Sequence, residues 1–140
     1  MTVVAPFRLI GLDHVVLRVS DLTAVKAFYQ SVLGCVLERE QPDIGLYQLR
    51  AGRSLIDLVS VAGKLGAAGG RPPASEGRNM DHLAITIDPF DEDAIRSHLA
   101  AFAIAVDEAG VRYGAEGEGP SIYIRDPEGN RVELKGPPAR

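Results

Sequence analysis

The chain repeats one pattern of residues, and this internal repeat constrains its fold more than any other feature. Residues 12–19 read LDHVVLRV, and residues 80–87 read MDHLAITI. Each segment has the composition of a β-strand and carries an Asp-His pair near its start. Helix-like spacing of apolar residues follows each segment, and short strand-like segments follow the helix. The sequence therefore predicts two copies of one supersecondary unit.

The predicted units are module one (residues 9–61) and module two (80–136), joined by a linker (62–79), within one domain over 1–140. The linker is rich in glycine and proline, which rarely sit inside regular elements. The order strand, helix and three strands predicts an α+β fold of two βαβββ modules. Pairing their sheets buries the apolar faces, with helices outside and a trough inside.

The limits of the helices are indicated by capping residues. Ser20-Asp21 offers an N-cap for the first helix, and Gly34 predicts its end. Asp88-Pro89 predicts the start of the second helix, because proline suits a first turn. Near the C-terminus, the segment 126–130, DPEGN, predicts a turn between the last two strands.

Side-chain alternation along the strands predicts which residues face the trough. In the first strand an apolar face (Val15, Leu17, Val19) alternates with His14 and Arg18. Such alternation puts the histidine and the arginine on one face, away from the helices, and the second repeat puts His82 on the same kind of face.

The last strand of each module adds a carboxylate to this face. Asp57 lies between two apolar residues in module one, and Glu133 lies between two in module two. Two imidazoles and one or two carboxylates suit one divalent ion, with zinc, nickel, iron and manganese all acceptable. A solvent-facing histidine or carboxylate on an amphipathic strand is the simpler reading of each residue alone. Repetition of both residue types in both modules favours the metal site.

Composition excludes several other classes of protein. Of 140 residues, 24% are charged and the formal net charge is −4, without any run of basic residues, so nucleic acid is not expected as a partner. No stretch reaches the roughly 18 apolar residues of a membrane span, so no membrane partner is expected. The single cysteine, Cys35, has no internal partner for a disulfide, and we expect a buried thiol in a cytoplasmic protein.

These segments resemble the vicinal oxygen chelate superfamily, which includes glyoxalase I, extradiol dioxygenases and fosfomycin- and bleomycin-resistance proteins. The resemblance rests on the two Asp-His strands and on the segment 124–134, IRDPEGNRVEL. It implies the paired βαβββ fold, with His14, His82 and Glu133 as metal ligands. The fourth glyoxalase I ligand is a glutamate, which falls on Asp57, so this ligand is less certain.

The resemblance also implies substrate contacts. Arg18 matches an arginine with which glyoxalase I-like proteins hold a carboxylate, a task that suits guanidinium. In fosfomycin-resistance proteins a serine and a tyrosine contact the phosphonate, and they match Ser121 and Tyr123. Alternation along the strand puts Arg125 on the same face.

The function implied first is that of a lactoylglutathione lyase-like metalloenzyme. Such a lyase or isomerase chelates a small oxygenated substrate on the metal and stabilises an enediolate, while Glu133 moves a proton. An iron(II) extradiol-type dioxygenase, a fosfomycin-resistance-like enzyme and a non-enzymatic bleomycin-resistance-like binding module remain alternatives.

The resemblance also favours a homodimer. In that assembly His14 and Asp57 of one chain meet His82 and Glu133 of the other. Pairing of the two modules within one chain remains the alternative. The glycine-rich segments 62–79 and 114–119 are either lids over the site or ordinary surface connections.

Overall fold

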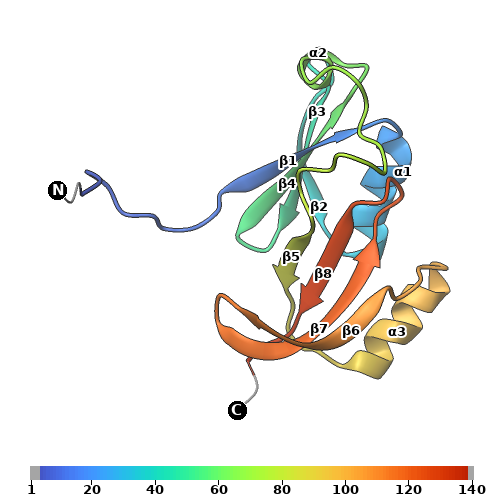
Figure 1. Cartoon of the computed structure of the whole chain (residues 1–140). Helices are drawn as coiled ribbons and strands as arrows, with labels where there is room; N and C mark the ends of the chain where they lie inside the picture. Colours follow the sequence, from blue (N-terminus) through green and yellow to red (C-terminus); the bar gives the residue numbers. More distant parts are fainter. Residues whose placement is uncertain (1–3, 139–140) are drawn as a thin grey trace.

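The computed structural model describes residues 4–138, and they form two units with the same order of elements (Figure 1). The first unit contains β1 (His14–Val19), α1 (Leu22–Ala27), the π-helical turn η1 (Phe28–Val32), β2 (Val36–Gln41), β3 (Leu46–Ala51) and β4 (Ser54–Ser60). The second contains β5 (Leu83–Thr86), α3 (Glu92–Ala101), β6 (Glu108–Gly114), β7 (Gly117–Arg125) and β8 (Arg131–Lys135). The predicted α+β class with two βαβββ modules is confirmed.

Each unit builds its own four-stranded sheet. The strand orders are β1-β4-β3-β2 and β5-β8-β7-β6, with the first pair parallel and the others antiparallel. The register is also repeated, since Val16 lies opposite Asp57 and Ala84 lies opposite Glu133. His14 lies two residues before Val16, and His82 lies two residues before Ala84. The histidine and the carboxylate therefore have the same relative position in both units.

The two faces of the first strand differ as the alternation predicts. Leu17 and Val19 are buried in the core, whereas Val16 on the other face is 50% exposed. In β5, Ile85 packs against the core while Ala84 is exposed. The histidine-bearing face of each sheet is thus the open one.

The first helix begins where the sequence predicts. Asp21 is its N-cap and accepts a hydrogen bond at Oδ1 from Ala24 N at 3.1 Å. The helix then widens into η1, which buries Phe28, Tyr29 and Val32 against the sheet. Gly34 ends the helical segment with φ +79°, a conformation that glycine adopts without strain.

The second helix begins later than predicted. Asp91 is the N-cap of α3 and accepts from Ala94 N at 3.1 Å, so the helix starts at Glu92. Asp88-Pro89 lies before it with a cis peptide bond, so the prediction of a helix start there is wrong. Asp91, three residues after Asp88, accepts a hydrogen bond from one of the free N–H groups of the first turn, so the helix is capped there and not at Asp88.

The segment predicted as a linker contains a short helix, α2 (Lys64–Ala67). It packs against the end of β4 at Gly66, where a Cβ atom would collide with the carbonyl oxygen of Ser60. No helix of the described residues 4–138 is long and apolar enough to span a membrane.

A buried carboxylate connects the two units. Asp126, 4% exposed, accepts hydrogen bonds from Tyr29 Oη (2.9 Å), Asn130 Nδ2 (2.8 Å) and the backbone N–H groups of Glu128 and Asn130 (both 2.9 Å). Burial raises the pKa of Tyr29 above its ordinary value, and Asp126 raises it further, so the phenol remains a donor. The contact fixes the first helical segment of module one on the last turn of module two.

Replacing Asp126 by alanine is expected to lower the free energy of unfolding by about 2–4 kcal/mol, because several buried donors lose their acceptor together. Tyr29→Phe removes one of these bonds and should cost only about 1 kcal/mol. Chemical denaturation followed by circular dichroism measures both. Equal losses in the two variants would contradict this role for Asp126.

Candidate metal centre

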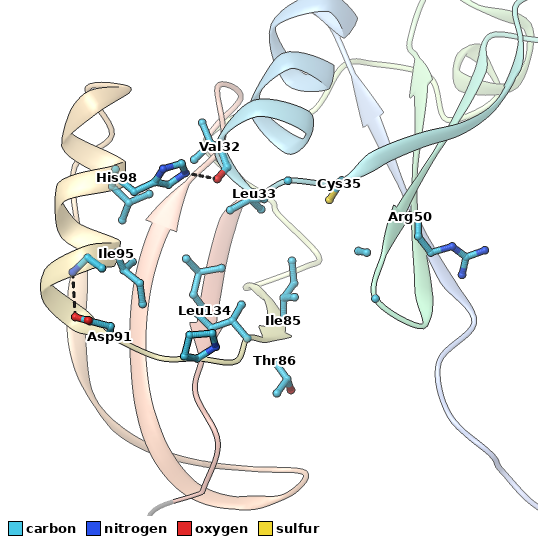
Figure 2. Close-up of a pocket in the computed structure, with 17 residues that line it drawn as sticks. Val32, Leu33, Cys35, Arg50, Ile85, Thr86, Asp91, Ile95, His98 and Leu134 are labelled. Carbon is cyan, nitrogen blue, oxygen red and sulfur yellow. Dashed lines mark hydrogen bonds between the residues drawn. The ribbon is translucent and has the colours of Figure 1, made fainter.

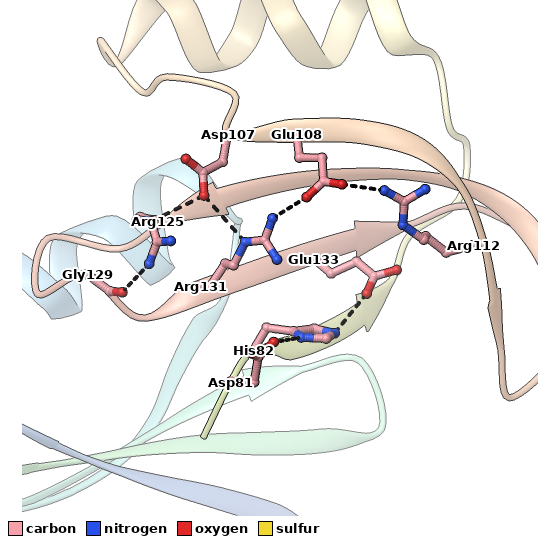
Figure 3. Close-up of polar contacts among 9 residues, drawn as sticks. All are labelled: Asp81, His82, Asp107, Glu108, Arg112, Arg125, Gly129, Arg131 and Glu133. Carbon is pink, nitrogen blue, oxygen red and sulfur yellow. Dashed lines mark hydrogen bonds and ion pairs between the residues drawn. The ribbon is translucent and has the colours of Figure 1, made fainter. Parts of the chain in front are cut away.

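The open face of the second sheet brings His82 and Glu133 together (Figure 3). The distance between His82 Nε2 and Glu133 Oε1 is 3.1 Å. Glu133 is 5% exposed, and Ser121 Oγ donates to its Oε2 at 2.6 Å. The Ser121 hydroxyl thus fixes Oε2 of Glu133, and Oε1 faces the imidazole of His82.

The open face of the first sheet repeats this arrangement less tightly. His14 Nε2 lies 4.0 Å from Asp57 Oδ2, and Gln48 Nε2 donates to the same oxygen at 3.2 Å. Asp57 is 3% exposed, and its Oδ1 has no hydrogen-bond partner among the described residues. A buried carboxylate oxygen without a partner is costly, and Asp57 Oδ1 therefore fits the role of a metal ligand.

A neighbouring aspartate orients each histidine. Asp13 Oδ2 lies 2.6 Å from His14 Nδ1, and Asp81 Oδ2 lies 2.7 Å from His82 Nδ1. Asp13 raises the pKa of His14, and the hydrogen bond to His82 lowers the pKa of Asp81. Protein metal sites commonly hold the non-ligating nitrogen of a histidine in this way, which leaves Nε2 for the ion.

The donor atoms fit a borderline divalent ion. Two ligands that each lie about 2.1 Å from one ion are roughly 3 Å apart, close to the separation of His82 Nε2 and Glu133 Oε1. However, within residues 4–138 no three histidine, cysteine, aspartate or glutamate side chains gather in a metal-binding cluster. The chain therefore presents two half-sites, one on each sheet, each with one imidazole and one carboxylate.

Arg18 lies on the His14 face, as the alternation predicts, and lines a cavity of about 550 Å³ with His14 and Asp57. Its guanidinium donates to the carbonyl oxygens of Gly66 (2.8 Å), Gly70 (2.6 Å) and Arg71 (3.2 Å). In this structure Arg18 therefore holds the connection between the modules against the half-site. Its contact with a substrate carboxylate stays a prediction.

Ser121 and Tyr123, which were matched to a phosphonate site, and Arg125 on the same strand have different surroundings. Ser121 contacts Glu133, as described above. Tyr123 lies under the guanidinium of Arg131, at 4.2 Å from its ring centroid, and edge-on to His82 at 5.6 Å. Burial and the Glu133 carboxylate raise the pKa of Tyr123. Arg125 lies at the end of the strand and pairs with Asp107 at 3.2 Å (Figure 3).

Several residues around the half-sites were not assigned from the sequence. Asp13 and Asp81 precede both histidines, so the repeat itself contains the pattern that identifies them. Gln48 contacts Asp57, and the Arg112 guanidinium lies 5.6 Å from the Tyr123 ring centroid, only because of strand register, which no local pattern reveals.

A separate apolar cavity of about 420 Å³ lies on the opposite face of the second sheet, between the two modules (Figure 2). Ile85 and Leu134 line it, and their neighbours in sequence, Ala84 and Glu133, face the other way. Cys35 also lines it, and burial raises the pKa of this thiol, as expected for an inert cysteine. This cavity belongs to the core side and not to the half-sites.

The family of the chain follows from its fold and from a match to a known family. Residues 11–134 match the Glyoxalase family, described as the Glyoxalase/Bleomycin resistance protein/Dioxygenase superfamily. The chain belongs to this superfamily, as the resemblance of its motifs implied.

Particular relatives are similar over most of their length. The virulence protein STM3117 of Salmonella typhimurium is 32% identical over 88% of this chain and 81% of its own. Its crystal structure superposes with a TM-score of 0.77, at 28% identity, over 94% of this chain and 99% of that one. A lactoylglutathione lyase from Agrobacterium tumefaciens reaches 0.65 at 25% identity, over 91% and 94%. The fosfomycin resistance protein FosX from Listeria monocytogenes, at 0.68, 22% identity and 91% of both chains, shows the same fold.

Proposed function

We propose that this chain is a metal-dependent lyase or isomerase of the glyoxalase type, which acts on a small oxygenated substrate at a site shared by two copies. His14 and Asp57 of one copy and His82 and Glu133 of the other supply the ligands. Membership of the superfamily and the similarity to a lactoylglutathione lyase support this reaction class.

One observation carries the proposal: each sheet presents the same oriented set of donors. An aspartate holds the histidine at Nδ1, and Nε2 faces a buried carboxylate at the same register position in both units. Asp57 Oδ1 adds a buried acceptor without a partner in the described chain. A second imidazole and an ion would satisfy these atoms.

A second copy explains the exposed surface around the half-sites. Val16 is 50% exposed on the His14 face, and the preceding segment, residues 4–13, extends away from the body of the chain (Figure 1). This segment carries Phe7, Leu9 and Ile10 with exposed fractions of 65–92%. An apolar surface of this kind is typical of an interface between subunits. In a twofold dimer, each half-site of one copy meets the complementary half-site of the other, so two complete sites form.

The residues of the second half-site perform the proton transfer. A divalent ion at this site supplies Lewis-acid stabilisation of negative charge on neighbouring substrate oxygens. The Glu133 carboxylate takes a proton from the carbon beside the substrate carbonyl and returns it to the adjacent carbon. Ser121 holds Oε2 during both steps, so the carboxylate keeps its orientation. Tyr123 and the guanidinium above it cover one side of the site and limit access of water.

An iron(II) oxygenase is the second candidate, because Asp57 Oδ2 lies 4.0 Å from His14 Nε2 rather than near 3 Å. If Asp57 stays outside the coordination sphere, two histidines and one carboxylate leave positions open for oxygen and substrate.

Elemental analysis of protein purified without chelators or a metal-affinity column tests both candidates. Near-stoichiometric nickel or zinc supports the lyase or isomerase, and iron with oxygen uptake on catechol-like compounds supports the oxygenase. Absence of metal, with no uptake on reconstitution, would contradict both and leave a ligand-binding module.

A further inference from the structure

The arginine of the first half-site holds the segment of chain that follows β4. Arg18 lies on the His14 face of β1, and each of its three guanidinium nitrogens donates to a backbone carbonyl. The acceptors are the carbonyl oxygens of Gly66 (2.8 Å), Gly70 (2.6 Å) and Arg71 (3.2 Å). They belong to the last turn of α2 and to the residues just after it, where a helix leaves carbonyl groups without partners. Arg18 thus satisfies the end of α2 from a strand of the half-site.

The backbone of this segment lies directly against the guanidinium. A Cβ atom at Gly69 would overlap Nε and Cζ of Arg18, so glycine alone permits this approach. At Gly66 a Cβ atom would overlap the carbonyl oxygen of Ser60, at the end of β4. The segment is therefore held at two points, by β4 and by Arg18. Because a helix of four residues has little stability of its own, these contacts set its position.

The held segment, residues 64–71, covers one end of the open face of the first sheet. Val59 lies two residues after Asp57 on β4, so both side chains leave the same side of the strand. Val59 is nevertheless only 3% exposed, whereas Val16 on this face is 50% exposed. α2 packs on this end of β4 (Figure 1). The open face is thus closed at Val59 and accessible at Val16.

Leu65 brings this segment into the cavity of the half-site. The cavity of about 550 Å³ is lined by side chains of β1, β3 and β4, among them His14 and Asp57, and by Leu65. Within the described chain, Leu65 is the one lining residue that lies outside the sheet. Strand pairing fixes the other lining residues, whereas the place of Leu65 depends on α2 and hence on Arg18. The free width of the cavity accordingly depends on the contact between Arg18 and this segment.

We propose that Arg18 is a positioning residue, which fixes residues 64–71 as a wall of the first half-site. Leu65 on this wall limits the size of the molecule that reaches His14 and Asp57. The nitrogens of Arg18 already donate to carbonyl groups, so Arg18 acts on the substrate through the wall and not by direct contact. The part that concerns the substrate rests on the proposed function, whereas the fixing of the wall does not.

The reactivity of a thiol inside the cavity tests the proposal without metal or turnover. Val59→Cys places this thiol in the full chain, and the native Cys35, which is buried, is the background. Mass spectrometry follows its reaction with methyl and with benzyl methanethiosulfonate, and each rate is divided by the rate in the unfolded chain. With the wall in place, the benzyl reagent should react about tenfold or more slowly than the methyl reagent.

Three changes to the wall should remove most of this difference. Arg18→Met removes the donors, and Gly69→Ala displaces the guanidinium while Arg18 itself is kept. Leu65→Ala shortens the side chain that faces the cavity. Arg18→Lys keeps a donor and should restore part of the difference. Two controls should keep the full difference: Arg53→Met, at an exposed arginine, and Gly11→Ala, whose Cβ atom meets nothing within 4 Å.

Activity of metal-loaded protein adds a readout that a purely structural role would not change. Arg18→Met and Leu65→Ala should lower KM for 2-hydroxyacetophenone relative to KM for hydroxyacetone, while the ratio of the two kcat values stays constant. An unchanged KM ratio in active variants would overturn the role of the wall in substrate selection.

The outcome of the thiol reaction decides the proposal in either direction. Equal rates for the two reagents in Val59→Cys alone, or an undiminished difference in folded Arg18→Met, would overturn it. If Arg18→Met does not fold, Gly69→Ala and Leu65→Ala decide it on the same terms. A chain that shows the size limit but neither binds metal nor acts on ketones refutes the proposed function, and the wall then limits the size of a bound ligand.

Discussion

Replacing His82 by alanine is expected to abolish stoichiometric metal binding while the fold remains intact. The imidazole supplies one of two nitrogen donors, and its Nε2 lies 3.1 Å from Glu133 Oε1. Because His82 is exposed on its polar side and lies just before β5, its removal leaves the core unchanged. Loss of this ligand should weaken metal binding by at least about a hundredfold, more than the 10–100-fold typical of a residue that only orients a ligand.

The third histidine of the chain provides the control. His98 lies on α3, and its Nε2 is 2.7 Å from the carbonyl oxygen of Val32, away from both half-sites. His98→Ala should keep the metal content of the wild type. Elemental analysis of both variants after dialysis measures the difference, and metal retained in His82→Ala would remove this residue from the site.

Replacing Glu133 by glutamine is expected to abolish turnover, with a loss of roughly 10²–10⁴-fold from the missing base. Glutamine has the same shape, and its amide oxygen still accepts the hydrogen bond from Ser121, so the strand keeps its packing. It has no carboxylate to take a proton, and it is also a poorer metal ligand.

Exchange of carbon-bound protons of small α-hydroxyketones into deuterated water, followed by NMR, measures this step on metal-loaded protein. Glu118→Gln is the matched control, since Glu118 lies exposed on β7. Full exchange activity in metal-loaded Glu133→Gln would show that another group moves the proton. Metal content is measured beside the rate, so a loss of metal is distinguished from the loss of a base.

The fold could be predicted from the sequence because the repeat and the alternation are local patterns. Val15, Leu17 and Val19 on one face, and His14 on the other, are placed by strand periodicity alone. Gly34 and Asp21 marked the limits of the first helix correctly. The start of the second helix was wrong because two N-terminal patterns, Asp88-Pro89 and Asp91, lie close together, and only the second caps the helix.

The surroundings of the site were harder to predict, since they depend on contacts between residues far apart in the chain. Arg18 meets carbonyl groups about fifty residues later, and nothing in its own strand indicates them. The sequence also did not predict whether the two half-sites meet within one chain or between two chains. Side-chain alternation gives the face of the sheet on which a residue lies, but not how the two sheets are arranged.

The central claim is that the metal centre is shared between two copies, and mixing two defective variants tests it most directly. His14→Ala and His82→Ala chains each lack one imidazole. In a twofold heterodimer, one site combines His14 and Asp57 of the second variant with His82 and Glu133 of the first and is complete, while the other site lacks both histidines. Random pairing after unfolding and refolding an equal mixture therefore restores about a quarter of the wild-type sites.

The measurement is bound metal per chain in the refolded mixture, compared with each variant refolded alone. The shared centre predicts almost no metal in either variant and about a quarter of the wild-type content in the mixture. A mixture as empty as its components, with refolded wild type fully loaded and dimeric, would contradict the shared site.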